Sequence, residues 1–216
     1  MSEVSEPLKP SMLTEIQLDA LREITNIGCG AAATALSQLL GGRRVGLEVT
    51  RSAILSFDEL EALLGGSESV RAAVHLTLRG GFEGWLLLAY DEDDASELAR
   101  FLAGPAAVPG EKSLSEMGKS ALMEVGNIVG SAFLNAVGKV SGMILLPSVP
   151  TLIHDRVARV VETLRQKPDG DESALEKMLV LETRLFAEGA PGIDGHVVIV
   201  PSPEALGLFL KTLGVD

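Results

Sequence analysis

Cysteine and positive charge are both scarce in this chain of 216 residues, and each shortage excludes a class of function. Cys29 is the only cysteine, so neither an intramolecular disulfide nor a cysteine-rich zinc site can form, and an intracellular protein is expected. Lys and Arg number 18 against 30 Asp and Glu, which gives a formal net charge of -12. Such acidity disfavours binding to a nucleic-acid backbone or an anionic membrane surface, so we expect no nucleic-acid partner.

Long apolar runs and targeting signals are also lacking. The first dozen residues have neither the basic start nor the apolar centre of a signal peptide, and residues 1–12 are expected to form a flexible leader. No apolar stretch approaches the roughly 20 residues that span a bilayer, because Trp85–Tyr90 has only the length of a strand. We therefore expect a cytoplasmic protein without membrane insertion.

Familiar catalytic patterns are missing too. The three histidines lie in unrelated segments, so the sequence indicates no nucleophile with an adjacent base. Cys29 lies among Gly and Ala, which favours a packed small residue over a nucleophile. Gly28 and Gly30 lie inside a helical pattern and not between a strand and a helix, which argues against a phosphate loop and a nucleotide-binding domain.

What the sequence does contain is an internal repeat. The segment Asp19–Gly28, DALREITNIG, returns as Ser120–Val129, SALMEVGNIV. Each copy has a Glu followed three residues later by an Asn, in a stretch otherwise typical of an apolar helix rich in small residues. Core packing does not explain a polar pair in such a helix, and two copies of the same type and spacing argue against chance.

Hydrophobic periodicity and turn residues predict the same order of elements in both halves of the chain. In the first half we expect helices at 14–40, 58–64 and 91–104 and strands at 45–49, 70–78 and 82–90. In the second half we expect helices at 114–140, 153–166 and 203–213, strands at 143–146, 179–185 and 195–200, and an acidic loop at 168–173.

This order of elements predicts an α/β (α+β) fold. We expect a pseudo-twofold duplicated single domain at 13–216, made of repeats at about 13–104 and 111–214 with a boundary near 105–110. A mixed or antiparallel sheet packed by helices is the simplest arrangement, because neither half has enough helix to cover a sheet of its own. The two long helices that carry the repeat are expected to be exposed on one side.

Helix geometry places the repeated polar residues together on that exposed side, at roughly 100° per residue. The first helix has Asp19, Glu23, Asn26, Gly30 and Ser37 on this side, opposite Leu21, Ile24, Gly28, Ala35 and Leu39. The second has Ser120, Glu124, Asn127, Ser131 and Gly138 on this side, opposite Leu122, Val125, Val129, Ala136 and Val140. Small residues beside a polar pair allow close approach of another macromolecule, so each polar side is interpreted as a docking face.

The chemistry available to a Glu and an Asn is narrow. An amide cannot act as a general base, but its carbonyl oxygen can hold and orient a water, as a Gln does in small GTPases. Such a residue is useful when the substrate brings its own metal and electrophile, as a phosphorylated protein with bound Mg²⁺ does. The Glu would then pair with a Lys near the phosphate. One Glu per helix is a poor cage for a cation, so no metal site of its own is expected.

With these motifs the chain resembles the CheC, CheX and FliY class of chemotaxis phosphatases, which hydrolyse the aspartyl phosphate of the response regulator CheY. The family pattern is Asp or Ser, three residues, Glu, two residues, Asn, twenty-two residues and Pro. The second copy fits it fully with Ser120, Glu124, Asn127 and Pro150. The first copy has Asp19, Glu23 and Asn26 but Val49 at the Pro position. The resemblance covers nearly the whole chain, and its two sites are most similar to the CheC type.

The resemblance implies that Asn26 and Asn127 orient the attacking water while Glu23 and Glu124 contact the Lys of the regulator. Mg²⁺ is then bound to the regulator, and a CheD-like receptor deamidase is a further expected partner. The four residues Asp19, Gly30, Ser120 and Ser131 are candidate partner contacts, although Asp19 and Ser120 also suit simple solvated positions. Pro150 is either part of the site or only the rigid start of a loop.

The main alternative is a non-catalytic binding module. Such a scaffold would dock a receiver domain or a CheD-like deamidase with the same surface and use it only for recognition.

Overall fold

The computed structural model describes residues 13–215 apart from 82, 111–112, 166–177 and 189–191, so the expected leader at 1–12 and acidic loop at 168–173 lie outside it. The first half contains α1 (Glu15–Leu39), β1 (Val45–Leu55), α2 (Phe57–Leu63), β2 (Val70–Gly80), β3 (Gly84–Tyr90) and α3 (Glu92–Ala103). After the short 3-10 helix η2 (Pro105–Ala107), the second half contains α4 (Glu116–Ser141), β4 (Leu145–Pro147), β5 (Thr151–Arg156), α5 (Val157–Arg165), β6 (Met178–Ala187), β7 (Ile193–Pro201) and α6 (Pro203–Thr212).

The described strands form one sheet in the order β1-β6-β7-β3-β2-β4, and β5 also pairs with β2. All of these pairs are antiparallel, which confirms the α/β fold class and selects the antiparallel alternative. Read from the other edge, the order is β4 with β5, then β2, β3, β7, β6 and β1. Each position then holds the counterpart, from the other half of the chain, of the strand that holds it in the first order, and β4 with β5 is the counterpart of β1. Strands of the first half (β1, then β3 and β2) therefore alternate across the sheet with strands of the second half (β6 and β7, then β4 and β5), and the two halves share one core.

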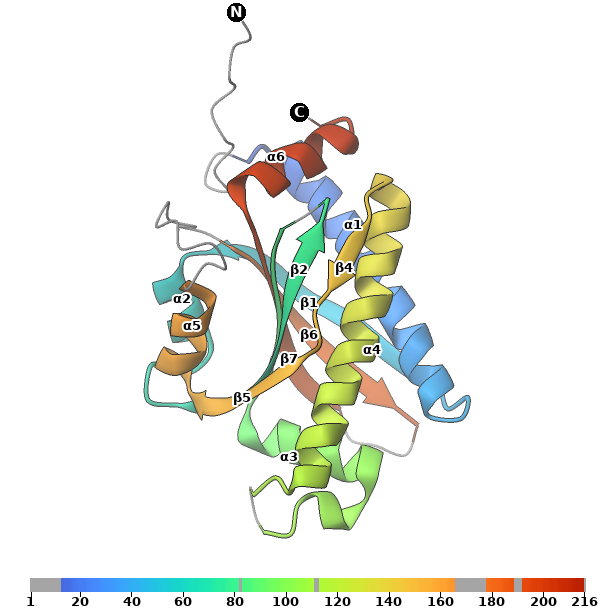
Figure 1. Cartoon of the computed structure of the whole chain (residues 1–216), viewed down its shortest axis with the longest axis vertical. Helices are drawn as coiled ribbons and strands as arrows, with labels where there is room; N and C mark the ends of the chain where they lie inside the picture. Colours follow the sequence, from blue (N-terminus) through green and yellow to red (C-terminus); the bar gives the residue numbers. More distant parts are fainter. Residues whose placement is uncertain (1–12, 82, 111–112, 166–177, 189–191, 216) are drawn as a thin grey trace, which may run out of the picture.

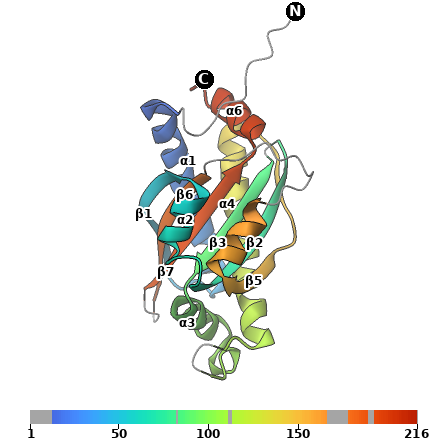
Figure 2. The same cartoon turned by 90° about the vertical axis from the view of Figure 1, so that its left-hand side faces the viewer.

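Helices cover both faces of this sheet. Helices α1 and α4 lie side by side on one face, whereas α2 and α5 lie on the other (Figures 1 and 2). The larger apolar cluster joins α1, α4 and α6 to the first face, and a smaller cluster joins α2 and α5 to the second. Every residue of β3 is buried, as its apolar composition predicts for a central strand.

Both long helices begin at a hydroxyl cap. Thr14 Oγ1 accepts a hydrogen bond from the N–H of Gln17 at 3.3 Å, and Ser115 Oγ accepts one from the N–H of Gly118 at 3.2 Å. These bonds satisfy one of the free N–H groups of each first turn. The predicted start of the first helix at Thr14 is therefore confirmed, and the two helices begin at equivalent positions of the repeat.

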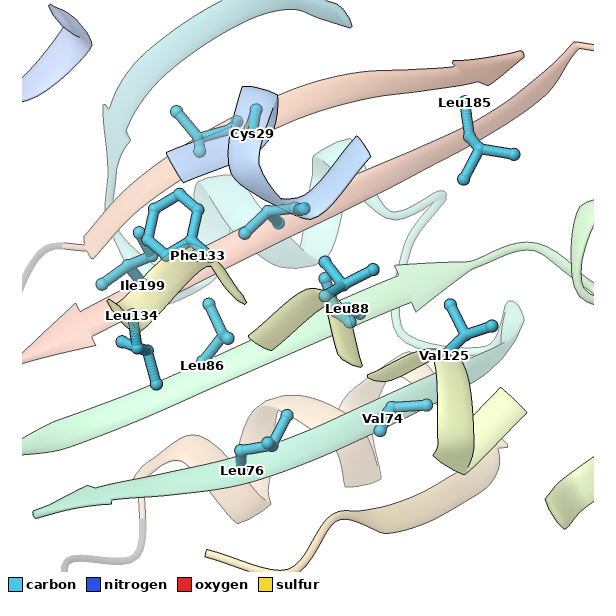
Figure 3. Packing of buried hydrophobic residues seen from close by; sticks show 14 of the residues in the cluster. Cys29, Val74, Leu76, Leu86, Leu88, Val125, Phe133, Leu134, Leu185 and Ile199 are labelled. Carbon is cyan, nitrogen blue, oxygen red and sulfur yellow. The ribbon is translucent and has the colours of Figure 1, made fainter. Parts of the chain in front are cut away.

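Glycine allows α1, α4 and the sheet to approach closely. A Cβ at Gly28 of α1 would overlap the ring of Phe133 of α4, and a Cβ at Gly126 of α4 would overlap Val74 of β2. Figure 3 shows Phe133 and Leu134 of α4 beside Leu86 of β3 and Ile199 of β7 in this layer. The rotation of each long helix about its axis is fixed by these contacts.

Two expected elements are wrong in their boundaries. The helix expected at 153–166 begins only at Val157, because Thr151–Arg156 is the strand β5. This strand lies at the edge of the sheet, and four of its six residues are exposed, so it lacks the apolar alternation of a half-buried strand. The strand expected at 45–49 is also too short, since β1 continues to Leu55.

The expected helix sides are correct near the middle of each helix and wrong at the ends. Leu39 and Val140, expected in the core, are 46% and 49% exposed in the last turns of their helices. Gly138, expected on the polar side, is buried because the chain turns back at Gly142, and the N–H of Met143 donates to the carbonyl of Gly138 at 3.1 Å. The expected sides therefore fail in the last turns, where the side chains of Leu39 and Val140 stay exposed and the following segment covers Gly138.

Helix α4 bears on the expectation that no segment is long and apolar enough to span a bilayer. It is long and apolar enough to cross a membrane by length and composition, and it is the one such helix among the described residues. Core helices of soluble proteins pass the same test, and the buried side of α4 packs on α1 and the sheet. Its place in the core accounts for its apolar composition.

Replacing Gly28 is expected to destabilise the fold. Gly28→Ala forces the Phe133 ring to shift in a packed layer and should lower the free energy of unfolding by about 1–3 kcal/mol. Gly30→Ala on the same helix meets no atom within 4 Å and should raise that free energy by up to about 1 kcal/mol through helix propensity. Urea denaturation measures both values, and equal midpoints for the two variants would contradict the packing described.

Acid is expected to weaken the fold partly through His75. Its Nε2 is buried with no hydrogen-bond partner among the described residues, and burial lowers its pKa from 6.5. The unfolded chain binds the proton more tightly, so this stability is present above pH 6.5 and is lost as the pH falls below it. Urea denaturation at about pH 7 and about pH 5 should show a smaller decrease in stability for His75→Leu than for the wild type. The same decrease in both proteins would refute this assignment.

Candidate functional site

The polar residues of the first copy lie together on the outer side of α1. Asp19, Glu23, Asn26 and Gly30 are all exposed, while Leu21, Ile24 and Gly28 are buried on the opposite side. The spacing of three and four residues places these side chains on neighbouring turns of one helix face. The first Glu and Asn are therefore presented to solvent together.

The second copy repeats this arrangement on α4 with less exposure. Ser120 and Glu124 are exposed, and Asn127 and Ser131 are half-buried. Within the described residues, the side chains of Glu23, Asn26, Glu124 and Asn127 take part in no hydrogen bond or ion pair. All four are thus available to a partner molecule.

A hollow of about 290 Å³ adjoins the first Asn. Its lining comes from α1 and β1, with one residue of β6: Arg22, Thr25, Asn26, Val49, Thr50, Arg51, Ser52 and Leu181. Val49 is the residue at the Pro position of the family pattern. The long spacing between the Asn and that position is therefore explained, because the chain returns along β1 to the same hollow.

Strand β1 contains a bulge at this hollow. Its register with β6 shifts by one residue between Val49 and Arg51, and Thr50 Oγ1 donates a hydrogen bond to the carbonyl of Glu182 at 3.1 Å. A bulge bends its strand and redirects the neighbouring side chains, and bulges are common beside functional sites. Here the bend lies next to Asn26.

The second copy has a break at the equivalent place. Strand β4 ends at Pro147, which pairs with Leu78 of β2, and β5 begins at Thr151, which pairs with His75 of β2. The segment from Pro147 to Thr151 is one residue longer than the segment of β2 from His75 to Leu78. Ser148 bridges the gap: its N–H donates to the Thr77 carbonyl at 2.8 Å, and its Oγ accepts from the Thr77 N–H at 3.0 Å. Because Pro150 has no N–H to give to a strand ladder, it suits this gap. Val49 occupies the corresponding bend in a continuous strand, so both copies keep an extra residue there.

Sequence reasoning missed the polar residues around the first hollow. Arg22 Nη1 lies 3.0 Å from Asp19 Oδ1, and Arg22 Nε donates to Ser52 Oγ at 3.0 Å. Arg51 Nη1 lies 3.1 Å from Glu182 Oε1. A signal for Arg22 was present, since it precedes Asn26 by four residues and so shares its helix face. The proximity of Ser52 depends on how β1 packs beside α1 and has no local signal.

Cys29 adds no reactive thiol to this surface. Cys29 is buried, which confirms a packed small residue, and burial raises the pKa of its thiol to about 12. The thiol therefore stays protonated and is a weak nucleophile. Over the described part of the chain, no group of three His, Cys, Asp or Glu residues is placed to hold a metal ion.

Comparison with known proteins gives a consistent result. A model of the CheC-like family matches residues 16–47, which include the first Glu and Asn. The chain is 31% identical to the protein named CheY-P phosphatase CheC of Bacillus subtilis over 207 residues, covering 94% of this chain and 97% of that protein.

Solved structures agree on the fold. The crystal structure of Thermotoga maritima FliY matches with a TM-score of 0.74 at 21% identity, covering 95% of this chain and 100% of that one. The FliM middle domain of H. pylori matches with a TM-score of 0.67 at 10% identity, covering 92% and 99%. At these identities the likeness supports the architecture alone.

Removing the Ser148 hydroxyl is expected to loosen the bend beside the second site. Ser148→Ala leaves the N–H of Thr77 without its 3.0 Å partner and should lower the free energy of unfolding by about 0.5–1.5 kcal/mol. Ser67→Ala is the control, because its hydroxyl takes part in no hydrogen bond within the described residues. Equal urea midpoints for the two variants would show that the bridge does not stabilise this bend.

Proposed function

The chain belongs to the CheC-like family, and we propose that it is a phosphatase that hydrolyses the aspartyl phosphate of a CheY-like response regulator. The observation that carries this proposal is the duplicated pair of Glu and Asn, exposed or half-buried on the outer sides of α1 and α4 and engaged by no described residue. A relative covering nearly the whole chain is named as such a phosphatase, which supports the same activity here.

In the proposed reaction each Asn positions a water. The side-chain carbonyl of Asn26 or Asn127 accepts a hydrogen bond from the water and directs its oxygen at the phosphorus. A bond forms from the water oxygen to phosphorus as the bond from phosphorus to the aspartyl oxygen breaks. The products are the free carboxylate of the regulator and inorganic phosphate, and the protons of the water pass to phosphate and solvent. Mg²⁺, bound to the regulator, neutralises charge on the phosphoryl group.

Each Glu acts in docking. Glu23 and Glu124 lie three residues before their Asn, about one helical turn away, and each pairs with the Lys beside the phosphate of the regulator. This ion pair fixes the position of the regulator along the helix and so the line of attack of the water. Asp19, Gly30, Ser120 and Ser131 flank these pairs and form the rest of the contact.

A scaffold is the alternative from a different class. A non-catalytic module would bind the phosphorylated regulator through the same helix faces without changing how fast the acyl phosphate decays. Binding of a CheD-like deamidase stays a prediction from the family resemblance, and a cytoplasmic location stays a prediction from the composition of the sequence.

Removal of both Asn side chains is expected to abolish catalysis and leave the fold intact. Loss of one well-placed polar group from a transition state costs about 2.7–4 kcal/mol, or roughly a hundredfold or more in rate. Asn26→Ala with Asn127→Ala should therefore return the decay of a phosphorylated CheY-like regulator to its spontaneous rate. The measurement is the release of inorganic phosphate over time, with each single variant showing what the remaining site contributes.

Asn135→Ala is the matched control, because Asn135 is an exposed Asn of α4 outside the motif. It should keep the full rate. Accelerated decay by the double variant, with a normal unfolding midpoint, would refute the assigned role of Asn. A wild-type protein that binds the phosphorylated regulator and leaves its decay unchanged would establish the scaffold instead.

A further inference from the structure

The two copies of the site differ in charge one turn before the Asn. In the first copy this position is Arg22, which lines the same hollow as Asn26. In the second copy the corresponding residue is Met123, and Ile153 replaces Ser52. The motif residues are shared, so the difference lies in what surrounds them.

The guanidinium of Arg22 is held in a defined orientation at the hollow. Nε donates to Ser52 Oγ of β1 at 3.0 Å, and Nη1 lies 3.0 Å from Asp19 Oδ1. No described residue accepts a hydrogen bond from Nη2. The guanidinium is thus anchored to β1 through Nε, and its Nη2 can still donate hydrogen bonds to a ligand.

The Asp19 partner is replaceable. The side chains of Arg22 and Asp19 are 52% and 73% exposed, and an exposed ion pair of this spacing is weak. A phosphoryl group offers three oxygens and more negative charge than one carboxylate, and guanidinium groups suit phosphate in particular. A phosphoryl group entering the hollow would therefore compete well with Asp19.

We propose that Arg22 is a catalytic residue of the first site alone, where its guanidinium contacts the phosphoryl oxygens and stabilises their charge during attack by water. This inference rests on the proposed function. Negative charge on the phosphoryl oxygens must be stabilised as the bond to the aspartyl carboxylate breaks, and an arginine supplied at that point is an established way to do so. The hydrolysis is otherwise the one described above, and Arg22 gains and loses no proton. The second site, with Met123, works without this cation.

The test isolates the first site with Asn127→Ala and then replaces Arg22 with Met, the residue of the second copy. The decay of a phosphorylated CheY-like regulator is followed with kcat and KM determined separately. We expect kcat to fall about 10- to 100-fold, with a smaller change in KM, because the charge is stabilised mainly in the transition state. Arg22→Lys should lose less of kcat than Arg22→Met, because Lys keeps the positive charge but lacks the planar set of guanidinium donors.

Arg159→Met is the matched control, because Arg159 and Glu162 form an exposed ion pair of the same spacing on α5. It should leave kcat unchanged. In an Asn26→Ala background, where only the second site works, Arg22→Met should add no further loss. An unchanged first-site kcat, or an equal loss in both backgrounds, would overturn the inference. Failure of the proposed function is recognised separately, because the wild type would then bind the phosphorylated regulator without accelerating its decay. Failure of the role given to Asn is recognised when the variant lacking both Asn side chains still accelerates decay.

Discussion

The contact of α1 and α4 with each other and with the sheet depends on positions where no side chain fits. Gly28 lies against Phe133, and Gly126 lies against Val74. A helix held this closely cannot rotate by one residue without bringing a larger side chain into the same space, since one residue corresponds to about 100°. The polar side of each helix is therefore directed outward by packing on its opposite side. The outward direction of the Glu and Asn is therefore set by packing in the core, and no contact made by the Glu or Asn side chains is needed to hold it.

Much of this arrangement is accessible from the sequence, because its signals are local. Helix periodicity locates α1 and α4, an unbroken apolar run identifies β3 as central, and repetition singles out the Glu and Asn. The strand β5 was missed because its exposed edge carries Thr151, His154, Asp155 and Arg156 and shows no apolar alternation. The hollow was missed for a different reason. Ser52 meets Arg22 only because β1 packs beside α1, and pairing between distant segments leaves no local pattern.

The two copies accommodate one extra residue at the same position by different means. The first accommodates an extra residue as a bulge in a continuous strand, and the second divides the strand and bridges the gap with Ser148. A Pro is compatible with the divided strand and Val49 with the bulged one, so the absence of the Pro in the first copy does not remove the bend. The side chains around the bend differ more, with Arg22 and Ser52 in one copy and Met123 and Ile153 in the other. The extra residue is thus kept while the side chains around it diverge.

The alternation of strands from the two halves has a consequence for synthesis of the chain. Among the described residues, strand β1 has no partner in its own half, because Val45 pairs with Ala187 and Leu55 with Met178. As the chain leaves the ribosome, β1 cannot form its ladder until β6, more than 120 residues further along, has also been made. Pairing across such a separation is slow, and an unpaired strand is prone to association in the meantime. The duplicated architecture therefore makes folding of the first half dependent on the second.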